Sequence, residues 1–421
     1  MPSQDFTGVI AFVNVNVVPM TEERVIPGQT VIVQDGKIAE IGPTDEVAIP
    51  ENAHRVEGMG KYLLPGLADM HTHIYYQEDL LLYIANGVTT VLNMGSPATI
   101  LQFREQVQRG EILGPAIFAS AFVDGAGNRG WIVRTPQEAR TDVRDLKSRG
   151  WDFIKVYNSI KAEVFQALME EAKQQGIAVI GHGVREPGMQ GILQAGQVMI
   201  AHAEEYLYTH FQNRFEAALI PSAITITKSA GAYVTTTLSA YETIMLQWGN
   251  PAGFDALLAK PEVKYVHPNW VNEWRSSNRY TRNTGTLTPA YEFQKQMVKN
   301  FHDAGIPLLL GTDTPTIPGI VPGFGIHQDL RNLVASGLTP YEAIKAGTQN
   351  AGEFIRRFVA GVAPFGTIEV GKRADLLLLQ QNPLSNIDNV SKRAGVMVRG
   401  RWLSEAKLRE MLDALAESFK K

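Results

Sequence analysis

The stretch 66-GLADMHTHIYY-76 ends an apolar run with two histidines one residue apart. Successive side chains of a strand point to opposite faces, so His71 and His73 share one face of an expected strand. Two imidazoles on one face suit a shared partner such as a metal ion. The alternative is that both are polar residues at a solvated strand end, each satisfied by water or by the backbone. The rest of the chain decides between these two interpretations.

Composition narrows the class of protein. The chain has 421 residues, of which 44% are hydrophobic and 19% charged, as in a well-packed globular protein with room for a barrel and a smaller domain. A net charge of -4 without a long basic run argues against nucleic-acid and anionic-membrane partners, which need clustered Lys and Arg. No apolar stretch is long enough to span a bilayer, and the first residues lack a signal-peptide pattern. We expect a cytoplasmic protein with a small-molecule substrate, although a removed signal peptide would leave no trace.

The pattern of expected strands, helices and turns divides the chain into two domains. Short alternating strands with Gly, Pro and Asp turns predict that residues 1–62 and 363–421 together form a small composite β-sandwich. Residues 63–362 alternate apolar strands with amphipathic helices, which is typical of a parallel sheet and, with eight strands, of a closed (β/α)8 barrel. The expected strands are 66–73, 89–93, 116–120, 153–157, 178–182, 198–202, 233–237 and 307–312. Residues 247–282, rich in Trp, Asn and Pro, are too long for an ordinary loop, and we expect them to form a lid over the barrel mouth.

Polar residues interrupt the expected barrel strands where the strands end, and the active site of such a barrel lies at the C-terminal ends of its strands. These residues are His71, His73, Lys155, His182, His202 and Asp313. The chain has no cysteine, so a metal must be held by His, Asp, Glu or a modified Lys. Neutral imidazole and carboxylate suit zinc, and a set split into two clusters suits two metals better than one.

Lys155 and Asp313 need chemical roles. An ammonium beside divalent cations would be repelled, but burial lowers the pKa of a lysine, and a neutral amine can add carbon dioxide to form a carbamate that bridges two metals. The alternative is an ion pair of Lys155 with Asp152. Asp313 can bind one metal and take a proton from water held between the metals, whose pKa falls from 15.7 to roughly 7 on coordination. Its alternative role is to cap the short segment that follows.

The motifs together resemble a known family over nearly the whole chain. They are "PGLADMHTH", "FIKVY", "GHG", "IAHAEE", "GIPLLLGTDTP", "GLTPYEAIKAGTQNAGEFI" and "GTIEVGKRADLLLL". The combination is similar to the metal-dependent amidohydrolase superfamily, and most of all to the branch with imidazolonepropionase-like proteins and Xaa-Pro dipeptidases. This resemblance implies a distorted (β/α)8 TIM barrel with a composite β-sandwich, a homo-oligomer, and two zinc or other divalent ions beside a carboxylated lysine.

The same resemblance implies a role for each candidate ligand. One metal would lie on His71, His73 and Asp313, the other on His182 and His202, with Lys155 as the bridge. Deaminase members of the superfamily generally use one metal and a Glu three residues after the fifth-strand His. Here that position is Arg185, and Glu186 comes one residue late, so deamination is disfavoured.

The expected activity is hydrolysis of a polarised carbonyl or phosphoryl group. We expect a binuclear metal-dependent hydrolase that cleaves an amide bond in a dipeptide or N-acyl amino acid through a metal-bridging hydroxide. The alternatives are a lactonase, carbamate hydrolase or phosphotriesterase with a neutral bulky substrate, and a non-catalytic scaffold, which the filled ligand positions disfavour. Candidate substrate-binding residues in loops after the strands are Tyr157, Arg129, Tyr206, Tyr208, His210 and His327. An Arg or His there would bind a carboxylate and a Tyr would donate to an oxyanion, unless the residue is merely solvated or packed.

Overall fold

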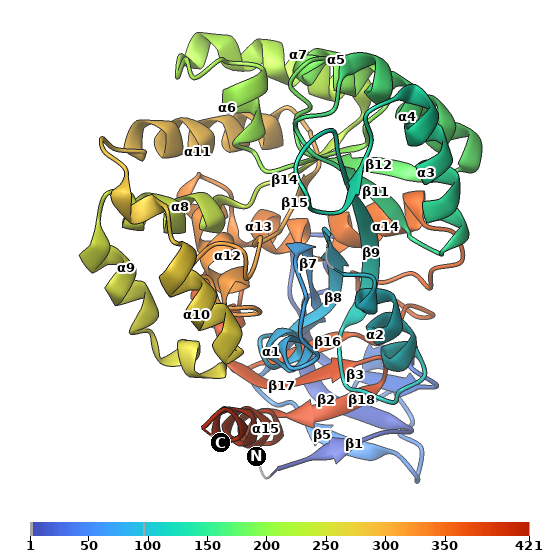
Figure 1. Cartoon of the computed structure of the whole chain (residues 1–421). Helices are drawn as coiled ribbons and strands as arrows, with labels where there is room; N and C mark the ends of the chain where they lie inside the picture. The colour runs from blue at the N-terminus through green and yellow to red at the C-terminus, as the bar shows by residue number, and fades with distance from the viewer. Residues whose placement is uncertain (1–2, 96, 421) are drawn as a thin grey trace.

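The computed structural model describes residues 3–95 and 97–420. It contains two sheets (Figure 1). One is a parallel sheet surrounded by helices, and the other is a mostly antiparallel sheet that lies below it, beside both chain ends. The polypeptide passes from the second sheet into the first and returns to it at the end.

The parallel sheet has eight strands in the order of the chain. They are β7 (Leu67–Thr72), β8 (Val88–Asn93), β9 (Ala116–Asp124), β11 (Phe153–Val156), β12 (Ala178–Gly181), β13 (Met199–Ala201), β14 (Tyr233–Thr235) and β15 (Leu308–Leu309), with β10 (Trp131–Ile132) paired beside β9. Backbone hydrogen bonds join the last strand to the first: Met70 N–H donates to Leu310 O and Asp313 N–H to His71 O, both at 2.8 Å. The barrel predicted from the sequence is confirmed.

The eighth strand is shorter than expected. The sequence predicts a strand over 307–312, whereas regular pairing covers only Leu308–Leu309. The chain then leaves strand geometry, and Asp313 reaches a φ of 60° in the left-handed region. Apolar alternation does not reveal such a backbone change, because it depends on the local turn rather than on burial.

Helices cover the outside of the barrel (Figure 1). They are α1 (Asp79–Ala85), α2 (Thr99–Gln108), α3 (Pro136–Ser148), α4 (Ala162–Gln175), α5 (Gly188–Gln194), α6 (Glu205–Thr209), α7 (Ile220–Ala230), α8 (Leu238–Gln247), α11 (Thr288–Asp303), α12 (Gly325–Ala335), α13 (Pro340–Ala346) and α14 (Gln349–Phe358), with the short η1 (Ala217–Leu219) before α7. Within the described part of the chain, none of the helices has both the length and the apolar character required to cross a bilayer.

The second sheet draws its strands from both ends of the chain, in the order β1-β18-β17-β16-β6-β2-β3-β4, with β5 beside β2. Its bounds are β1 (Asp5–Phe6), β2 (Ile10–Val17), β3 (Ile26–Gln34), β4 (Lys37–Pro43), β5 (His54–Glu57), β6 (Tyr62–Pro65), β16 (Leu376–Leu379), β17 (Arg393–Val398) and β18 (Arg401–Ser404). The antiparallel pair β6–β16 joins the two halves. Helix α15 (Glu405–Ser418) packs on β17 and α1, and η4 (Ile387–Ser391) precedes β17. The domain boundaries given above stay a prediction.

The expected lid segment, 247–282, is helical and lies beside the barrel, next to α8 and α12 (Figure 1). It contains α9 (Pro251–Leu258), η2 (Pro261–Tyr265), α10 (Pro268–Ser277) and η3 (Tyr280–Arg282). A small apolar cluster joins the segment to the barrel through Leu82 of α1 and Val321, against which Phe254, Val266 and Trp274 pack. The segment therefore packs against α1 and the loop that follows β15.

Candidate metal centre

Three of the predicted ligands converge where the first and eighth strands meet. The Nε2 atoms of His71 and His73 lie 3.3 and 3.0 Å from the same atom, Oδ1 of Asp313. The three possible ligand atoms lie within 4.8 Å of one another. Ligand atoms bound to one tetrahedral zinc ion lie about 3.3 Å apart, so this spacing suits a single metal ion.

The backbone aims Asp313 at the histidines. Its φ of 60° is unusual for a residue other than glycine and costs about 1 kcal/mol or more. The Asp313 N–H donates to His71 O at 2.8 Å, and the Thr316 hydroxyl donates to Asp313 O at 2.8 Å. These bonds hold the turn and leave the carboxylate facing the imidazoles. In the described residues the carboxylate therefore contacts His71 and His73, and the capping role considered above is not what its contacts indicate.

The contacts of His73 test whether a metal fits. The carbonyl oxygen of Gly95 can only accept a hydrogen bond, so His73 Nδ1 donates to it at 2.8 Å. In a neutral imidazole this leaves Nε2 as an acceptor. That Nε2 lies 3.0 Å from Asp313 Oδ1, which is also an acceptor. Two acceptors at this distance repel each other unless a positive charge lies between them, and a set of N and O ligands suits a divalent metal.

His182 and His202 lie beside this group. The ring centroid of His202 is 4.3 Å from that of His71 and 4.7 Å from that of His182. His202 Nδ1 contacts the Thr237 hydroxyl at 2.9 Å, and His182 Nε2 lies 3.8 Å from Glu205 Oε1. Burial lowers the pKa of His202 to about 4 and that of His182 well below its usual value. Both imidazoles are therefore neutral near pH 7, which is the form that binds metals.

Lys155 points into the ring of histidines. Its Nζ lies 3.1 Å from His71 Nε2, and the side chain is almost fully buried. Burial lowers the pKa of Lys155 to about 8, so about a tenth of the amine is neutral at pH 7 and able to react with carbon dioxide. The alternative partner, Asp152, is engaged elsewhere: it pairs with Arg104 at 2.8 Å and accepts the Ala119 N–H at 2.9 Å. The ion pair between Lys155 and Asp152 is not formed.

Sequence reasoning missed Asp69, which lies on the barrel strand β7. Its Oδ1 accepts the N–H groups of His71 and Thr312 at 3.2 and 3.1 Å, and its Oδ2 accepts the Thr312 hydroxyl at 2.6 Å. Burial raises the pKa of Asp69 to about 8. The side chain thus ties the first and eighth strands together beneath the candidate ligands. The signal was present in the sequence, because alternation places residue 69 on the same strand face as residues 71 and 73.

Sequence reasoning also missed Glu204 and Glu205, which follow His202. Glu205 is buried, and its Oε2 accepts the Gly183 N–H at 3.1 Å, which fixes it beside His182. Burial and the charges of Glu205 and Asp313 raise the pKa of Glu204 to about 8. Two acids at the second and third positions after a histidine at a strand end were a signal for groups that contact the ligands from outside.

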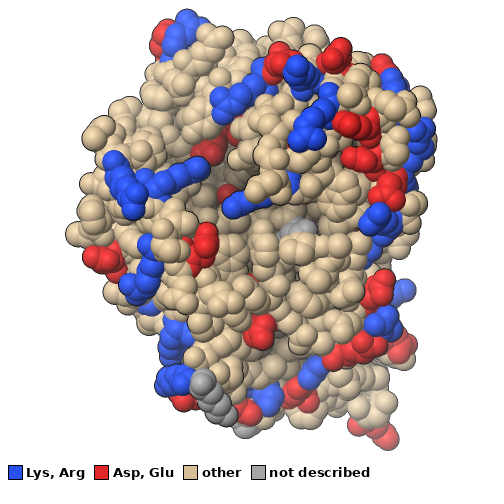
Figure 2. Space-filling model, viewed as in Figure 1, with Lys and Arg blue, Asp and Glu red and all other residues tan. Residues whose placement is uncertain are grey.

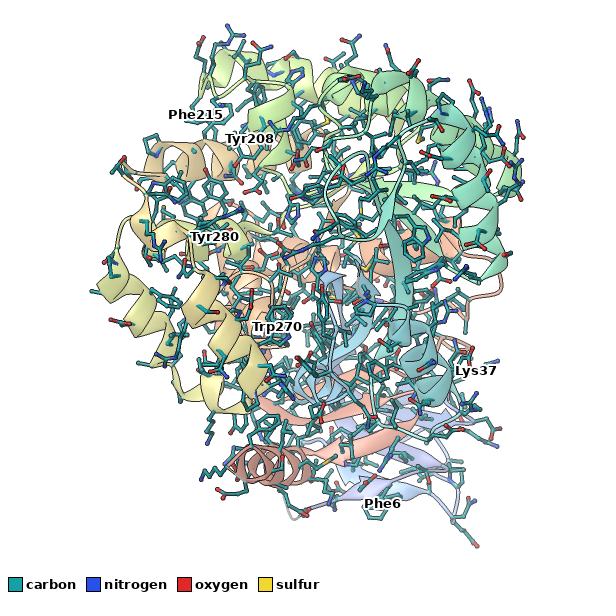
Figure 3. The ribbon with its side chains drawn as sticks, in the orientation of Figure 1. Phe6, Lys37, Tyr208, Phe215, Trp270 and Tyr280 are labelled. Carbon is teal, nitrogen blue, oxygen red and sulfur yellow. The ribbon has the colours of Figure 1, made fainter. Side chains whose placement is uncertain are left out.

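Of the predicted substrate-binding residues, Tyr157 lies beside the candidate metal ligands. Its ring centroid lies 4.3 Å from that of His182 and 5.2 Å from that of Phe122. Arg129 is exposed in the loop after β9, and Tyr208 is 41% exposed on α6. Figure 2 shows a hollow in this face with acidic and basic side chains at its border, and Tyr208 lies beside open space in the matching view of Figure 3.

The other three predicted substrate-binding residues have partners elsewhere. The Tyr206 hydroxyl contacts that of Thr227 at 2.7 Å within the helical layer. His210 Nε2 contacts the Ser222 hydroxyl at 2.7 Å. His327 is buried, and its Nε2 accepts a hydrogen bond from Arg393 of the second sheet at 3.2 Å. The structure does not bring these side chains to the six candidate ligands.

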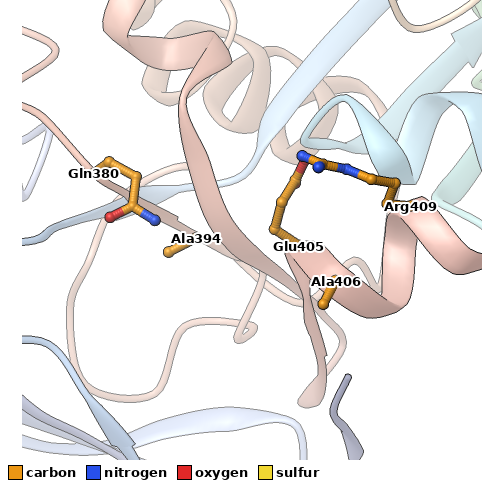
Figure 4. A pocket seen from close by; sticks show the side chains of 5 residues that line it. All are labelled: Gln380, Ala394, Glu405, Ala406 and Arg409. Carbon is orange, nitrogen blue, oxygen red and sulfur yellow. The ribbon is translucent and has the colours of Figure 1, made fainter. Parts of the chain in front are cut away.

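The pockets beside α15 lie apart from the candidate ligands. One has a volume of about 210 Å³ and is lined by Gln380, Ala394, Glu405, Ala406 and Arg409 (Figure 4). A neighbouring cleft of about 400 Å³ shares Glu405 and Arg409 and extends to η2 and α1. Neither lining includes a barrel-strand histidine. The candidate metal ligands therefore lie outside these two pockets.

The chain belongs to the amidohydrolase family, whose model matches residues 62–403. Over 55 residues, 12% of either chain, it is 46% identical to the dihydroorotase of Mycobacterium tuberculosis, so it spans only a small part of that relative. It is similar over 99% of its length to all of a structure assigned as a prolidase from Bifidobacterium longum, with 25% identity and a TM-score of 0.69. A Xaa-Pro dipeptidase with methionine bound in its active site shares the fold, at 17% identity and a TM-score of 0.70 over 94% of this chain and 100% of that one.

Proposed function

We propose that this hydrolase of the amidohydrolase family is a binuclear enzyme that cleaves an amide bond in a dipeptide or an N-acyl amino acid. The single observation that carries the proposal is the convergence of the His71 and His73 Nε2 atoms on Asp313 Oδ1, with Lys155 Nζ 3.1 Å from His71. The similarity to a prolidase and a Xaa-Pro dipeptidase supports a dipeptide as the substrate. Homo-oligomerisation and a cytoplasmic location stay predictions.

The proposed ligands form two groups. His71, His73 and Asp313 would hold one divalent ion, His182 and His202 the other, and a carbamate on Lys155 would bridge them. Such ions, when bound, polarise a carbonyl oxygen and lower the pKa of water. The carbamate would form when the neutral Lys155 amine attacks carbon dioxide and releases one proton, which turns a neutral group into an anion among the histidines.

Asp313 would move the proton. Although burial raises its pKa, the facing side chains of His73, His202 and Lys155 lower it overall to about 2, so the group is a carboxylate. A carboxylate can accept a proton from the attacking water and deliver it to the departing amine. The amide C–N bond then breaks as the new C–O bond remains, and the amine leaves neutral.

Tyr157 and Arg129 would bind the substrate. Tyr157, whose ring packs on His182, would donate its hydroxyl proton in a hydrogen bond to the oxygen that becomes negative during attack. Arg129 lies in the exposed loop after β9 and would pair with the free carboxylate of the substrate. We leave out Tyr206, His210 and His327, because their polar atoms already bond to other residues.

Aromatic side chains near the mouth favour a second candidate, hydrolysis of a neutral bulky ester, lactone, carbamate or phosphotriester. Tyr208 and Tyr280 lie on the same side of the molecule in Figure 3, with Trp270 below them. Tyr208 is 41% exposed, so part of its ring is open to contact with a ligand. Such a rim would contact a bulky apolar substrate without requiring a carboxylate on it.

The test uses matched substrates. Zinc-loaded protein is assayed by mass spectrometry on dipeptides and N-acyl amino acids, each beside its C-terminal amide, and on neutral lactones, carbamates and phosphotriesters. We expect about two zinc ions per chain and turnover confined to substrates with a free carboxylate. Turnover of the neutral compounds alone would replace the first candidate with the second. An inactive protein with one zinc ion would contradict the binuclear mechanism itself.

A further inference from the structure

Helix α10 contacts the loop that carries Asp313. The indole Nε1 of Trp274 donates to Pro315 O at 2.8 Å, and Pro315 lies two residues after Asp313. Trp274 is 1% exposed and packs in an apolar cluster with Leu82 and Val321. This hydrogen bond attaches the loop that carries Asp313 to the lid segment. It lies beyond the end of β15, where regular strand pairing has stopped.

The same helix also contacts the loop that carries His73. Asn269 Nδ2 donates to the hydroxyl of Tyr76 at 3.2 Å, and Tyr76 lies three residues after His73. His267, directly before α10, stacks on the Tyr76 ring with centroids 3.7 Å apart and planes 3° apart. One short helix therefore touches both loops that leave the first group of ligands.

The loops of the second group are held differently. Gln197 Nε2 donates to the carbonyl oxygens of Gly181 and His182 at 3.0 and 3.1 Å. His202 contacts Thr237, at the start of α8. The hydrogen bonds described for these two histidine positions thus come from the barrel and its own connections. The two described hydrogen bonds from α10 side chains to ligand-bearing loops go to loops of the first group.

We propose that α10 positions the first metal site, so that Trp274 and Asn269 set the affinity of the His71–His73–Asp313 site for a divalent ion and leave the His182–His202 site unchanged. The inference rests on the proposed function only in assuming that the first group binds a metal. The physical reason is that Asp313 sits in a strained turn after a two-residue strand, where a shift of a few tenths of an ångström separates its carboxylate from the imidazoles. Trp274 and Asn269 are positioning residues, since they contact neither ligand atoms nor substrate.

The test measures zinc affinity at one site at a time. His182→Ala leaves the first group intact, and His73→Ala leaves the second intact. Trp274→Phe is introduced into each background, and the dissociation constant for zinc is measured by competition with a chelator. We expect about 10-fold weaker binding in the His182→Ala background, the lower end of the effect of outer-shell partners, and no change in the His73→Ala background.

Trp270→Phe is the matched control. Trp270 lies on the same helix, and its Nε1 has no hydrogen-bond partner among the described residues, so this substitution removes an indole without removing a bond. It should leave both affinities unchanged. Equal weakening at both sites by Trp274→Phe, or the same effect from Trp270→Phe, would overturn the inference and leave the proposed function standing. A His182→Ala parent that binds no zinc would overturn the assumed metal site, and the inference with it.

Two substitutions at the exposed Asn269 and the half-buried Tyr76 provide a second test that leaves the buried Trp274 ring in place. Asn269→Ala and Tyr76→Phe remove the two partners of one hydrogen bond. In the His182→Ala background each should weaken zinc binding, by about 2- to 5-fold, and the double variant should be no weaker than either single one. Additive effects on the zinc dissociation constant would show that this hydrogen bond does not influence the position of His73. They would contradict the role of Asn269. Thermal unfolding in chelator establishes that the variants are folded.

Discussion

Charged and polar side chains cluster both at the barrel mouth and in the pockets beside α15, but the groups that face one another differ between the two places. Beside α15, Glu405 lies 3.4 Å from Arg409 and 3.7 Å from Arg393, so opposite charges meet. At the mouth, the acceptor Nε2 of His73 lies 3.0 Å from the acceptor Oδ1 of Asp313. The comparison shows that the convergence of N and O donor atoms, rather than the presence of a hollow, distinguishes the group that could hold a metal ion.

Asp313→Asn is expected to have the largest effect. The amide keeps the shape of the side chain but can neither accept a proton nor supply a charged metal ligand, so kcat should fall about 1000-fold. Steady-state kinetics of the zinc-loaded variant measures this. Asp388→Asn, in an exposed ion pair with Arg331, is the control and should retain the parental rate. A variant at position 313 with more than a tenth of the parental kcat would contradict the proposed role.

Lys155→Ala tests the bridge between the two groups. Without the carbamate we expect the zinc content to fall from about two ions to about one per chain and activity to fall about 100-fold. Short carboxylates such as acetate should restore part of the activity, because they can occupy the place of the carbamate. Lys161→Ala, on the surface before α4, should change neither quantity. Full zinc content without Lys155 would eliminate the bridge from the mechanism.

Tyr157→Phe tests the proposed oxyanion donor. Removal of one hydrogen bond that forms in the transition state should lower kcat about 10-fold with little change in KM. Tyr62→Phe, in the second sheet, removes a hydroxyl far from the mouth and serves as the control. A change in KM alone would assign Tyr157 to substrate binding instead of catalysis.

The smallest effect is expected in the second sheet, where charges are already paired. Asp5 forms two hydrogen bonds with Arg401, at 2.8 and 2.7 Å, and these lower its pKa. A lowered carboxyl pKa stabilises the fold above the unfolded pKa, and this contribution is lost as the pH falls through the folded value. Asp5→Asn should lower the free energy of unfolding at pH 7 by about 0.5 kcal/mol because the pair is partly exposed. Denaturant unfolding at pH 7 and at pH 3 should give a smaller difference at pH 3; an equal difference would rule out the charge as its origin.

Much of the barrel could be predicted because its strands are continuous apolar runs, each ending at a polar residue. Alternation placed His71 and His73 on one face, and the rule that strand ends meet at the mouth placed Lys155 and His202 with them. The same reasoning did not find Asp69, whose importance lies in hydrogen bonds to Thr312 across the closing seam of the barrel. Such a bond joins residues far apart in the chain and leaves no local pattern.

The sequence by itself determined the class of fold, the types of ligand and their order along the chain, because periodicity and the absence of cysteine are local properties. Only the tertiary structure determined which side chains contact one another. It paired Asp152 with Arg104 and so left Lys155 to the histidines, and it brought α10 onto the loop of Asp313. The physical reason is that side-chain distances of about 3 Å depend on how distant segments pack together, whereas strand and helix patterns depend on neighbours in the chain.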